Sequence, residues 1–396
     1  MALRVHSRTL GADGGRWRLS FAIDGLPAGS QTVWLEGPAE VRPAHDRLDP
    51  LAGPAMLAGL MLGRDVHLAG PVSRVLVEAL NTRLQDVLSL WLERERIIVS
   101  ADDLVEIEPA EGGWRACTFS GGVDSMHAML RHRGEIDAAV VVAGYDYELK
   151  YSDRFEQVLP DILAAVELFD VPALLLKTNI RDVLDPVVSW EMSFGSAMAM
   201  TAHALAGRVR SFYWPSSTSY DSPGQYGSHP LLDDYWSTPA MAIVPTGSDR
   251  RRVQKVEDVA TCENHERVLG RLRVCWQPAA GGLNCGRCEK CLRTMVALAS
   301  FGRLGECRFD EPLTAEKLES LKLWTTSLRF MWQQNLDNLR RLQIREDLAA
   351  AIEKTIFLGT PKPPGWAPRR TIGERMRRLV PGSIKRIARQ FRSTAS

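Results

Sequence analysis

Residues 114–145, WRACTFSGGVDSMHAMLRHRGEIDAAVVVAGY, decide the fold of this chain. The apolar run at 114–119 predicts a strand, and 124–134 predicts a helix that ends at Gly134. Residues 137–145 predict a second, buried strand. A strand, a helix and a buried strand in this order indicate a βαβ unit with parallel strands. Two glycines, two serines and an aspartate lie between the first strand and the helix.

The same alternation continues to residue 217. Helical patterns at 152–169 and 195–207 alternate with strand patterns at 171–179 and 209–217. We therefore expect an α/β fold with a doubly wound parallel sheet. Ligands of such sheets bind at the carboxyl ends of the strands, which is where residues 120–125 fall.

The flanking segments differ from this core. Residues 1–112 combine strand patterns (16–24, 32–37 and 96–101) with helical patterns (50–62 and 71–92), which predicts an N-terminal α+β domain. The α/β domain would occupy 113–302 and a helical C-terminal extension 303–358. A Pro-rich linker and basic tail would occupy 359–396.

Composition limits the classes of function. The 396 residues are 45% hydrophobic and 24% charged with a net charge of +1, so the whole chain is neither a basic nucleic-acid binder nor an acidic protein. No apolar run reaches the length of a bilayer span, and the N-terminus does not resemble a signal peptide. Seven cysteines are too few for a disulfide scaffold in a chain of this length. We expect a cytoplasmic protein.

The glycine loop is suited to an anion. Gly121 and Gly122 let the backbone wrap closely, and the following helix points free N–H groups and its positive end at the same place. Ser120 and Ser125 add hydroxyl groups, while Asp124 is suited to capping the helix or to holding Mg²⁺ through water. The simpler alternative is a strand–turn–helix corner with a polar cap.

Four cysteines predict a metal centre: Cys275, Cys285, Cys288 and Cys291. Four thiolates complete the closed tetrahedral shell of structural zinc. An iron–sulfur cluster is the main rival, and free buried cysteines are a weaker one. Cys262 and His265 form a weaker pair, from which a ligand could replace Cys275.

The order Ser-Gly-Gly-x-Asp-Ser resembles the PP-loop of the ATP-pyrophosphatase superfamily, whose members cleave ATP to AMP and pyrophosphate. The resemblance implies the fold of that superfamily (the HUP type), with ATP and Mg²⁺ as cofactors. It also implies that Ser120, Gly121, Gly122, Val123, Asp124 and Ser125 hold the pyrophosphate portion of ATP.

The cysteine pattern narrows the resemblance to one branch. A PP-loop followed by a single Cys, C-G-x-C-x₂-C and then Arg293 resembles 7-cyano-7-deazaguanine synthase and its relatives. In that branch a carboxylate is adenylated, ammonia displaces AMP, and a second activation forms a nitrile. The resemblance covers roughly residues 114–302, and Asp146 and Tyr147 also fit. This chain is longer at both ends, and residues 216–241 show no recognisable deazaguanine-binding pattern.

Further candidates follow from topology and charge. Arg181 follows the strand at 171–179 and lies at its carboxyl edge, which Asn179, the last residue of that strand, shares. Arg251 and Lys255, in a segment with Arg250 and Arg252, would stabilise charge on pentacoordinate phosphorus. For any one of these basic side chains, a solvated helix start is the alternative.

The sequence thus predicts an AMP- and pyrophosphate-forming, ligase-like enzyme. It would adenylate a small or macromolecule-borne carboxylate and pass the acyl group to ammonia or another nucleophile. A nucleobase-thiolating enzyme on tRNA and an inactive nucleotide-binding module are the alternatives. The tail from residue 369 has nine Arg or Lys and one Glu, a net charge of +8. It is suited to RNA, an anionic membrane surface or an acidic protein, or it is a disordered basic tail.

Overall fold

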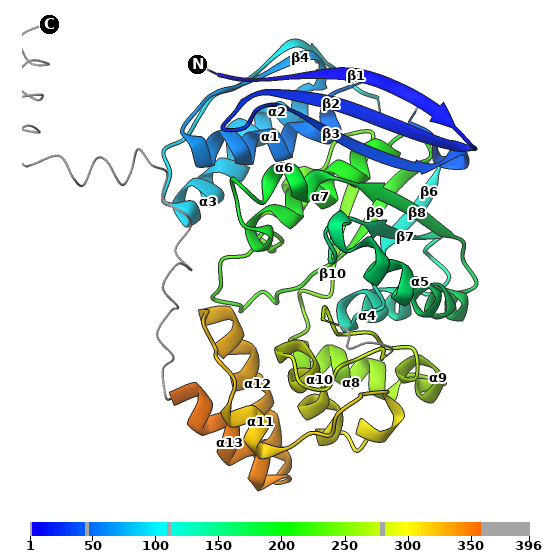
Figure 1. Cartoon of the computed structure of the whole chain (residues 1–396), viewed down its shortest axis with the longest axis vertical. Coiled ribbons are helices and arrows are strands. Elements are labelled where there is room, and N and C mark those ends of the chain that lie inside the picture. The colour runs from blue at the N-terminus through cyan, green and yellow to red at the C-terminus, as the bar shows by residue number, and fades with distance from the viewer. Residues whose placement is uncertain (1, 44–46, 109–111, 278–281, 358–396) are drawn as a thin grey trace, which may run out of the picture. The chain divides into compact units, whose positions relative to one another are not determined.

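The strands of the described residues form one ten-stranded sheet, in the order β10-β9-β6-β7-β8-β3-β2-β1-β4-β5 (Figure 1). The computed structural model describes residues 2–43, 47–108, 112–277 and 282–357. The predicted linker and basic tail at 359–396 lie outside these residues. No helix among the described residues is long and apolar enough to cross a membrane.

The parallel half of the sheet holds the predicted α/β core. Its strands are β6 (Trp114–Thr118), β7 (Ala138–Ala143), β8 (Ala173–Thr178), β9 (Val209–Pro215) and β10 (Ala242–Thr246). Every adjacent pair among these five strands is parallel. The chain runs outward from β6 to β8 and then returns to the other side of β6 to form β9. The predicted α/β class with parallel strands is confirmed, and the point where the strand order reverses lies between β6 and β9.

Helices cover both faces of this parallel half. They are α4 (Val123–Arg131), α5 (Ser152–Val166), α6 (Ile180–Leu184) and α7 (Trp190–Leu205). Alternate residues along a strand face opposite sides. Cys117 and Val141 accordingly lie in the core with α4 and α5, whereas Ala116 and Val140 lie in the core with α7. This arrangement is compatible with a doubly wound fold.

The N-terminal segment extends the same sheet. Its elements are β1 (Leu3–Asp13), β2 (Arg16–Leu26), β3 (Gly29–Pro38), η1 (Ala39–Val41), α1 (Asp49–Leu62), β4 (Val66–Ser73), α2 (Arg74–Asn81), α3 (Arg83–Leu92) and β5 (Val99–Val105). β3 pairs antiparallel with β8, with Leu35 opposite Thr178, and α1 packs on α7.

The helix predicted over 71–92 is wrong in its extent. β4 includes residues 71–73, and the helical part breaks between α2 and α3. The amide of Asn81 bonds to the backbone of β5, accepting from Val99 N at 2.9 Å and donating to Val99 O at 2.8 Å. Thr82 then has φ −125° and ψ −97°, which is not helical. Side-chain bonds to a neighbouring strand thus replace the continuing helix.

The chain after β10 is helical, as predicted for its last part. The helices are α8 (Arg252–Thr261), α9 (His265–Leu269), α10 (Glu289–Ser300), α11 (Ala315–Glu319), α12 (Thr326–Leu342) and α13 (Glu346–Phe357). Short 3₁₀ turns are η2 (Leu149–Tyr151), η3 (Glu167–Phe169), η4 (Asp233–Trp236) and η5 (Leu304–Glu306). Trp332 and Leu336 of α12 pack with Leu292 of α10 in a core of their own. This core holds α12 beside α8 and α10.

Candidate functional site

The loop between β6 and α4 presents backbone amides at the start of a helix. Gly121 has φ +75°, a conformation that favours glycine. Gly122 is the N-cap of α4 with an extended backbone, φ −80° and ψ 171°. The first N–H groups of a helix have no intrahelical partner. The amides of Val123, Asp124 and Ser125 are therefore suited to binding an anion at the positive end of α4.

The two serines of the loop hold its shape. The Ser125 hydroxyl donates to Gly122 O at 3.1 Å and accepts from Ser120 N at 3.3 Å. The Ser120 hydroxyl lies 3.5 Å from that of Ser125 and accepts from Gly122 N at 3.4 Å. The Val123 side chain is buried in the core shared with α5, so only its backbone amide is available to a ligand. The loop is thus braced before any ligand binds.

Asp124 joins α4 to the start of α8. Its Oδ1 lies 3.2 Å from Lys255 Nζ, and its Oδ2 is paired with Arg252. Lys255 also donates to Ser216 O, directly after β9. These contacts bring together residues from both sides of the point where the strand order reverses, which is where ligands of such sheets bind.

The charges of this cluster stabilise one another. Burial alone would raise the pKa of Asp124, but the neighbouring charges of Arg252 and Lys255 outweigh it and lower that pKa. Burial lowers the pKa of Lys255, whose side chain is 2% exposed, and Asp124 opposes that shift. With both basic groups protonated, two cations face one carboxylate, so the cluster keeps an excess positive charge beside the loop amides.

Several buried polar groups beside the loop have no hydrogen-bond partner among the described residues. They include Ser216 Oγ, Arg252 Nε, and Nε and Nη2 of Arg273. Buried polar groups are nearly always satisfied in folded proteins, so each such exception needs an explanation. Arg252 pairs with Asp124 at the start of α4, and an anion bound beside this pair would supply an acceptor for Arg252 Nε.

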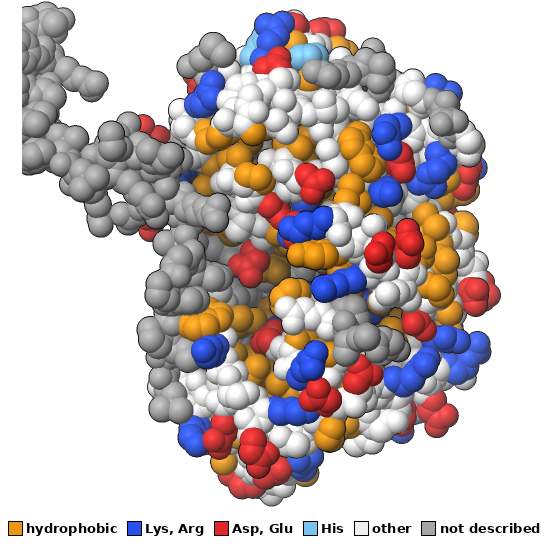
Figure 2. Space-filling view, viewed as in Figure 1, with side chains coloured by type: hydrophobic (Ala, Val, Ile, Leu, Met, Phe, Trp, Pro, Cys, Tyr) orange, Lys and Arg blue, Asp and Glu red, His pale blue; other side chains and the backbone are white. Residues whose placement is uncertain are grey.

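A narrow pocket opens at this cluster. Its lining includes Ser217, Thr218, Arg252, Lys255, Phe330 and Gln334. Helix α12 forms one wall, since Gln334 accepts from Arg252 N at 3.0 Å. Figure 2 shows this face of the molecule hollowed between the region of α7 and that of α12. The residues after β9, the cations of α8 and helix α12 thus border this recess.

A larger pocket, of about 400 Å³, lies on another side of α4. It is lined by His127, Arg131, Asp249, Arg250 and Asp258. Both of its arginines are paired, Arg131 with Asp249 at 2.6 Å and Arg250 with Asp258 at 2.9 Å. Because its cations are already neutralised, this pocket is the weaker candidate for an anionic ligand.

Three other predicted site residues make their side-chain contacts away from the glycine loop. Arg181 pairs with Asp185 at 2.8 Å, donates to Tyr145 O and stacks on Trp190. The Asn179 amide bonds to the backbone of β3, accepting from Trp34 N at 2.8 Å. Arg251 is half exposed and pairs with Asp221. Of the predicted catalytic residues, Asp124, Ser125 and Lys255 come together at the loop, while the side chains of Arg181 and Arg251 are engaged elsewhere.

Ser228, His229 and Asp233 form a buried polar cluster after β9. Asp233 is fully buried and accepts from Ser228 Oγ at 3.0 Å and His229 N at 2.9 Å. Ser228 in turn accepts from Trp214 Nε1 at 2.9 Å. Burial raises the pKa of Asp233 to about 8. Its contacts fix this segment on β9 below the site.

The sequence did not indicate Arg273 as a site residue, and it indicated Arg252 only as one of several basic residues in the same segment. Arg273 N donates to Gly121 O at 2.8 Å, and its guanidinium donates to Ser120 O at 3.0 Å. It stands two positions before Cys275, and no local pattern in the sequence links it to a loop 150 residues earlier. Arg252 follows a β10 strand that the sequence analysis did not predict.

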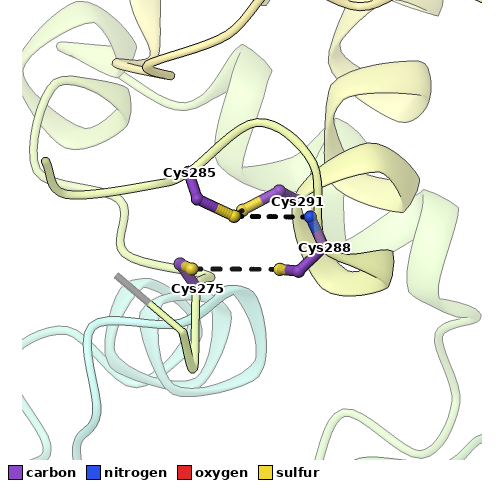
Figure 3. A group of neighbouring side chains, drawn as sticks. All are labelled: Cys275, Cys285, Cys288 and Cys291. Atoms are coloured by element: carbon purple, nitrogen blue, oxygen red, sulfur yellow. Dashed lines mark hydrogen bonds between the residues drawn. The ribbon is translucent and has the colours of Figure 1, made fainter. Parts of the chain in front are cut away.

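The four predicted cysteines converge on one point (Figure 3). Cys275 follows α9, Cys285 lies in the next loop, Cys288 is the N-cap of α10, and Cys291 is in its first turn. All four Sγ atoms lie within 4.8 Å of one another, with 3.8 Å between Cys275 and Cys288 and 3.9 Å between Cys285 and Cys291. Cys262 and His265 are not part of this group among the described residues.

The geometry of the thiol cluster fits a metal ion. Four sulfurs at about 2.3 Å from a tetrahedral zinc ion stand about 3.8 Å apart, which matches the separations of the Cys275–Cys288 and Cys285–Cys291 pairs. Backbone amides already face the sulfurs, since Cys288 N donates to Cys285 Sγ at 3.3 Å and Gln277 N to Cys275 Sγ at 3.2 Å. Such bonds stabilise thiolates. The cluster is therefore suited to a metal such as zinc.

A left-handed glycine and a buried asparagine shape this centre. Gly286 has φ +67°, and a Cβ atom there would lie 2.3 Å from Glu311 O, so only glycine fits the turn between Cys285 and Cys288. Asn284 accepts from Val274 N and Cys275 N at 2.7 and 3.2 Å, and donates to Leu272 O and Arg308 O. These bonds bring the segment of Cys275 beside that of Cys285.

Comparison with protein-family models, curated proteins and solved structures found no match to this chain.

Proposed function

We propose that this protein is an ATP-dependent, ligase-like enzyme of the PP-loop type, related to 7-cyano-7-deazaguanine synthase. It activates a carboxylate as an acyl-adenylate, releases pyrophosphate, and passes the acyl group to ammonia or another nucleophile. One observation carries the proposal: the SGGVDS loop lies at the point where the strand order reverses, with the cations Arg252 and Lys255 paired to the Asp124 carboxylate at the start of α4.

The β- and γ-phosphates of ATP bind to the amides of the loop at the start of α4. A substrate carboxylate oxygen then attacks the α-phosphorus, the bond to the bridging oxygen breaks, and pyrophosphate leaves. Arg252 and Lys255 stabilise the negative charge that develops on the phosphoryl oxygens. Asp124 orients these two cations, and Mg²⁺, entering with ATP, would neutralise further phosphate charge near it.

The second step is an acyl transfer. The nucleophile attacks the acyl carbon, AMP leaves from the adenylate, and the nucleophile loses a proton. Ammonia would give an amide in this way. The recess between α7 and α12 is the proposed entry for the acceptor, and α12 limits access of water to the adenylate.

The metal centre has a structural role in this proposal. Four thiolates leave no open position on a tetrahedral zinc ion, so the ion would hold the segment from Arg273 to α10 together. The thiolation alternative requires cysteines that carry sulfur or an iron–sulfur cluster. Sulfur separations of 3.8 and 3.9 Å favour a single tetrahedral ion, and thus the carboxylate-activating reaction.

The test is the identity of the products formed from ATP. The protein is incubated with Mg²⁺, ATP, ammonium and a panel of carboxylic acids, and AMP, pyrophosphate, ADP and phosphate are measured. We expect AMP and pyrophosphate in equal amounts, and none with Asp124→Ala. Asp153→Ala is the matched control, because Asp153 is an exposed acidic residue in the first turn of α5. ADP with phosphate, or equal AMP from Asp124→Ala and the parent, would contradict the proposal.

A further inference from the structure

Arg273 makes two contacts with the glycine loop, and both are to carbonyl oxygens. Its guanidinium donates from Nη1 to Ser120 O at 3.0 Å, and its backbone N donates to Gly121 O at 2.8 Å. A Cβ atom on Gly121 would lie 3.4 Å from Arg273 Cβ, so the two segments are in close contact. One residue therefore holds two successive carbonyls of the loop.

The planarity of the peptide bond gives these contacts a consequence for the amides. In a trans peptide the C=O and the following N–H point in opposite directions. When Arg273 holds Ser120 O and Gly121 O on its own side, the N–H groups of Gly121 and Gly122 point to the other side. The Gly121 amide is thereby aligned for an anion on the face of the loop away from Arg273, while the Gly122 amide donates to Ser120 Oγ at 3.4 Å and holds the turn.

The segment that follows Arg273 is also held by hydrogen bonds to a residue next to the cysteine cluster. Val274 N and Cys275 N, the next two amides of the chain, both donate to Asn284 Oδ1. Asn284 immediately precedes Cys285, and Cys275 Sγ lies 3.8 Å from Cys288 Sγ. A metal ion bound by these sulfurs would fix the segment of Arg273 against the loop.

The charge of Arg273 is only partly balanced. The side chain is 4% exposed, its Nη1 lies 3.6 Å from Asp146 Oδ2, and its guanidinium lies 5.1 Å from the centre of the Tyr147 ring. Nε and Nη2 have no hydrogen-bond partner among the described residues. A buried cation behind the loop adds positive potential where the proposed triphosphate binds.

We propose that Arg273 is a positioning residue that couples the four-cysteine metal centre to the glycine loop. The bound metal fixes Arg273, Arg273 holds the carbonyls of Ser120 and Gly121, and the loop amides are thereby set to receive an anionic phosphate. Loss of the metal therefore lowers anion affinity from a distance. The identity of the anion as ATP rests on the proposed function, whereas the coupling between metal and loop does not.

Hydrogen exchange tests the coupling without a ligand. The amides of residues 117–126 and of Arg273 are followed by mass spectrometry in the metal-loaded protein, in the protein stripped by a chelator, and in Arg273→Met. We expect exchange at least about tenfold faster in the last two at Arg273 or in the loop. Exchange in β1 to β3 should stay unchanged and shows that the fold persists. Loop and Arg273 exchange unaffected by stripping, or faster exchange throughout the chain, would overturn the inference.

Binding of Mg²⁺–ATP, measured by calorimetry, tests the consequence. Arg273→Met should weaken binding at least about tenfold, and stripping the metal should weaken binding by this variant less than it weakens binding by the parent, since both changes loosen the same segment against the loop. Arg273→Lys, which keeps a cation, should recover part of the loss. Arg271→Met is the control, because Arg271 is 41% exposed and only loosely paired with Asp161.

The outcomes separate the two proposals. If the parent fails to bind ATP, the proposed function is wrong, and the exchange experiment still decides the coupling. If the parent binds ATP and Arg273→Met binds it equally well with its metal retained, the coupling is wrong and the proposed function stands.

Discussion

Replacing Lys255 by Met removes a buried cation from beside Asp124 and keeps most of the aliphatic stem. The ammonium lies 3.2 Å from Asp124 Oδ1, and the two side chains are 2% and 18% exposed. Removing one partner of a buried pair costs about 3–5 kcal/mol, and we expect about 3 kcal/mol here because Arg252 continues to pair with Asp124. Arg251, on the same segment, provides a matched control. It pairs with Asp221 with side chains 49% and 44% exposed, so Arg251→Ala should cost less than about 1 kcal/mol.

Urea unfolding of the parent and both variants measures these costs. Because part of the loss in each single variant is the same attraction between Lys255 and Asp124, the double variant Asp124→Asn/Lys255→Met should be less destabilised than the two single variants together. A coupling of at least about 1 kcal/mol is expected for groups in direct contact. Equal costs for Lys255→Met and Arg251→Ala, or strictly additive effects with Asp124→Asn, would refute the view that this cluster is a buried charge network.

Three further changes test other parts of the structure. Asp233 has a folded-state pKa of about 8 against 3.8 for the free side chain, so the folded state binds the extra proton and stability falls as pH rises between these values. Between pH 5 and pH 8 the free energy of unfolding of the parent should fall by about 4 kcal/mol from this group, and Asp233→Asn should remove that fall. Free energies of unfolding that change in parallel in the two proteins over this pH range would contradict the reasoning. Gly121→Ala should lower the free energy of unfolding by about 1–2 kcal/mol, because Gly121 has φ +75°. Gly122→Ala, at φ −80°, should lower it less when both variants are unfolded in urea. The protein should be colourless and contain one zinc ion per chain by elemental analysis, and Cys285→Ser should lose this zinc. Iron, together with absorbance at about 400 nm, would instead indicate an iron–sulfur cluster.

Local patterns were enough to predict β6 to β9 of the parallel half of the sheet, but not β10. The buried runs that become β6 to β9 are bounded by helices of the right period, and their order gives a parallel sheet with the glycine loop at its carboxyl edge. The antiparallel pairing of β3 with β8 could not be predicted from local patterns. It depends on contacts between residues about 140 positions apart, such as Leu35 with Thr178 and the Asn179 amide with Trp34.

The site residues that lie close together in the sequence could be predicted. The spacing of Cys285, Cys288 and Cys291 places their sulfurs together through one turn and the start of α10. Asp124 and Lys255 were each candidates on the basis of residue type. Their direct contact arises only from the packing of α8 on α4, and Arg273 reaches the loop through the turn before Cys275. No local pattern encodes these tertiary contacts.

The most direct measurement is a crystal structure of the protein with Mg²⁺ and an ATP analogue that cannot be cleaved between the α- and β-phosphorus. The account predicts β- and γ-phosphate oxygens within hydrogen-bond distance, about 2.7–3.2 Å, of amides in residues 121–125, with Arg252 or Lys255 beside the α-phosphate. Phosphates bound elsewhere, with these amides facing a protein side chain, would contradict it.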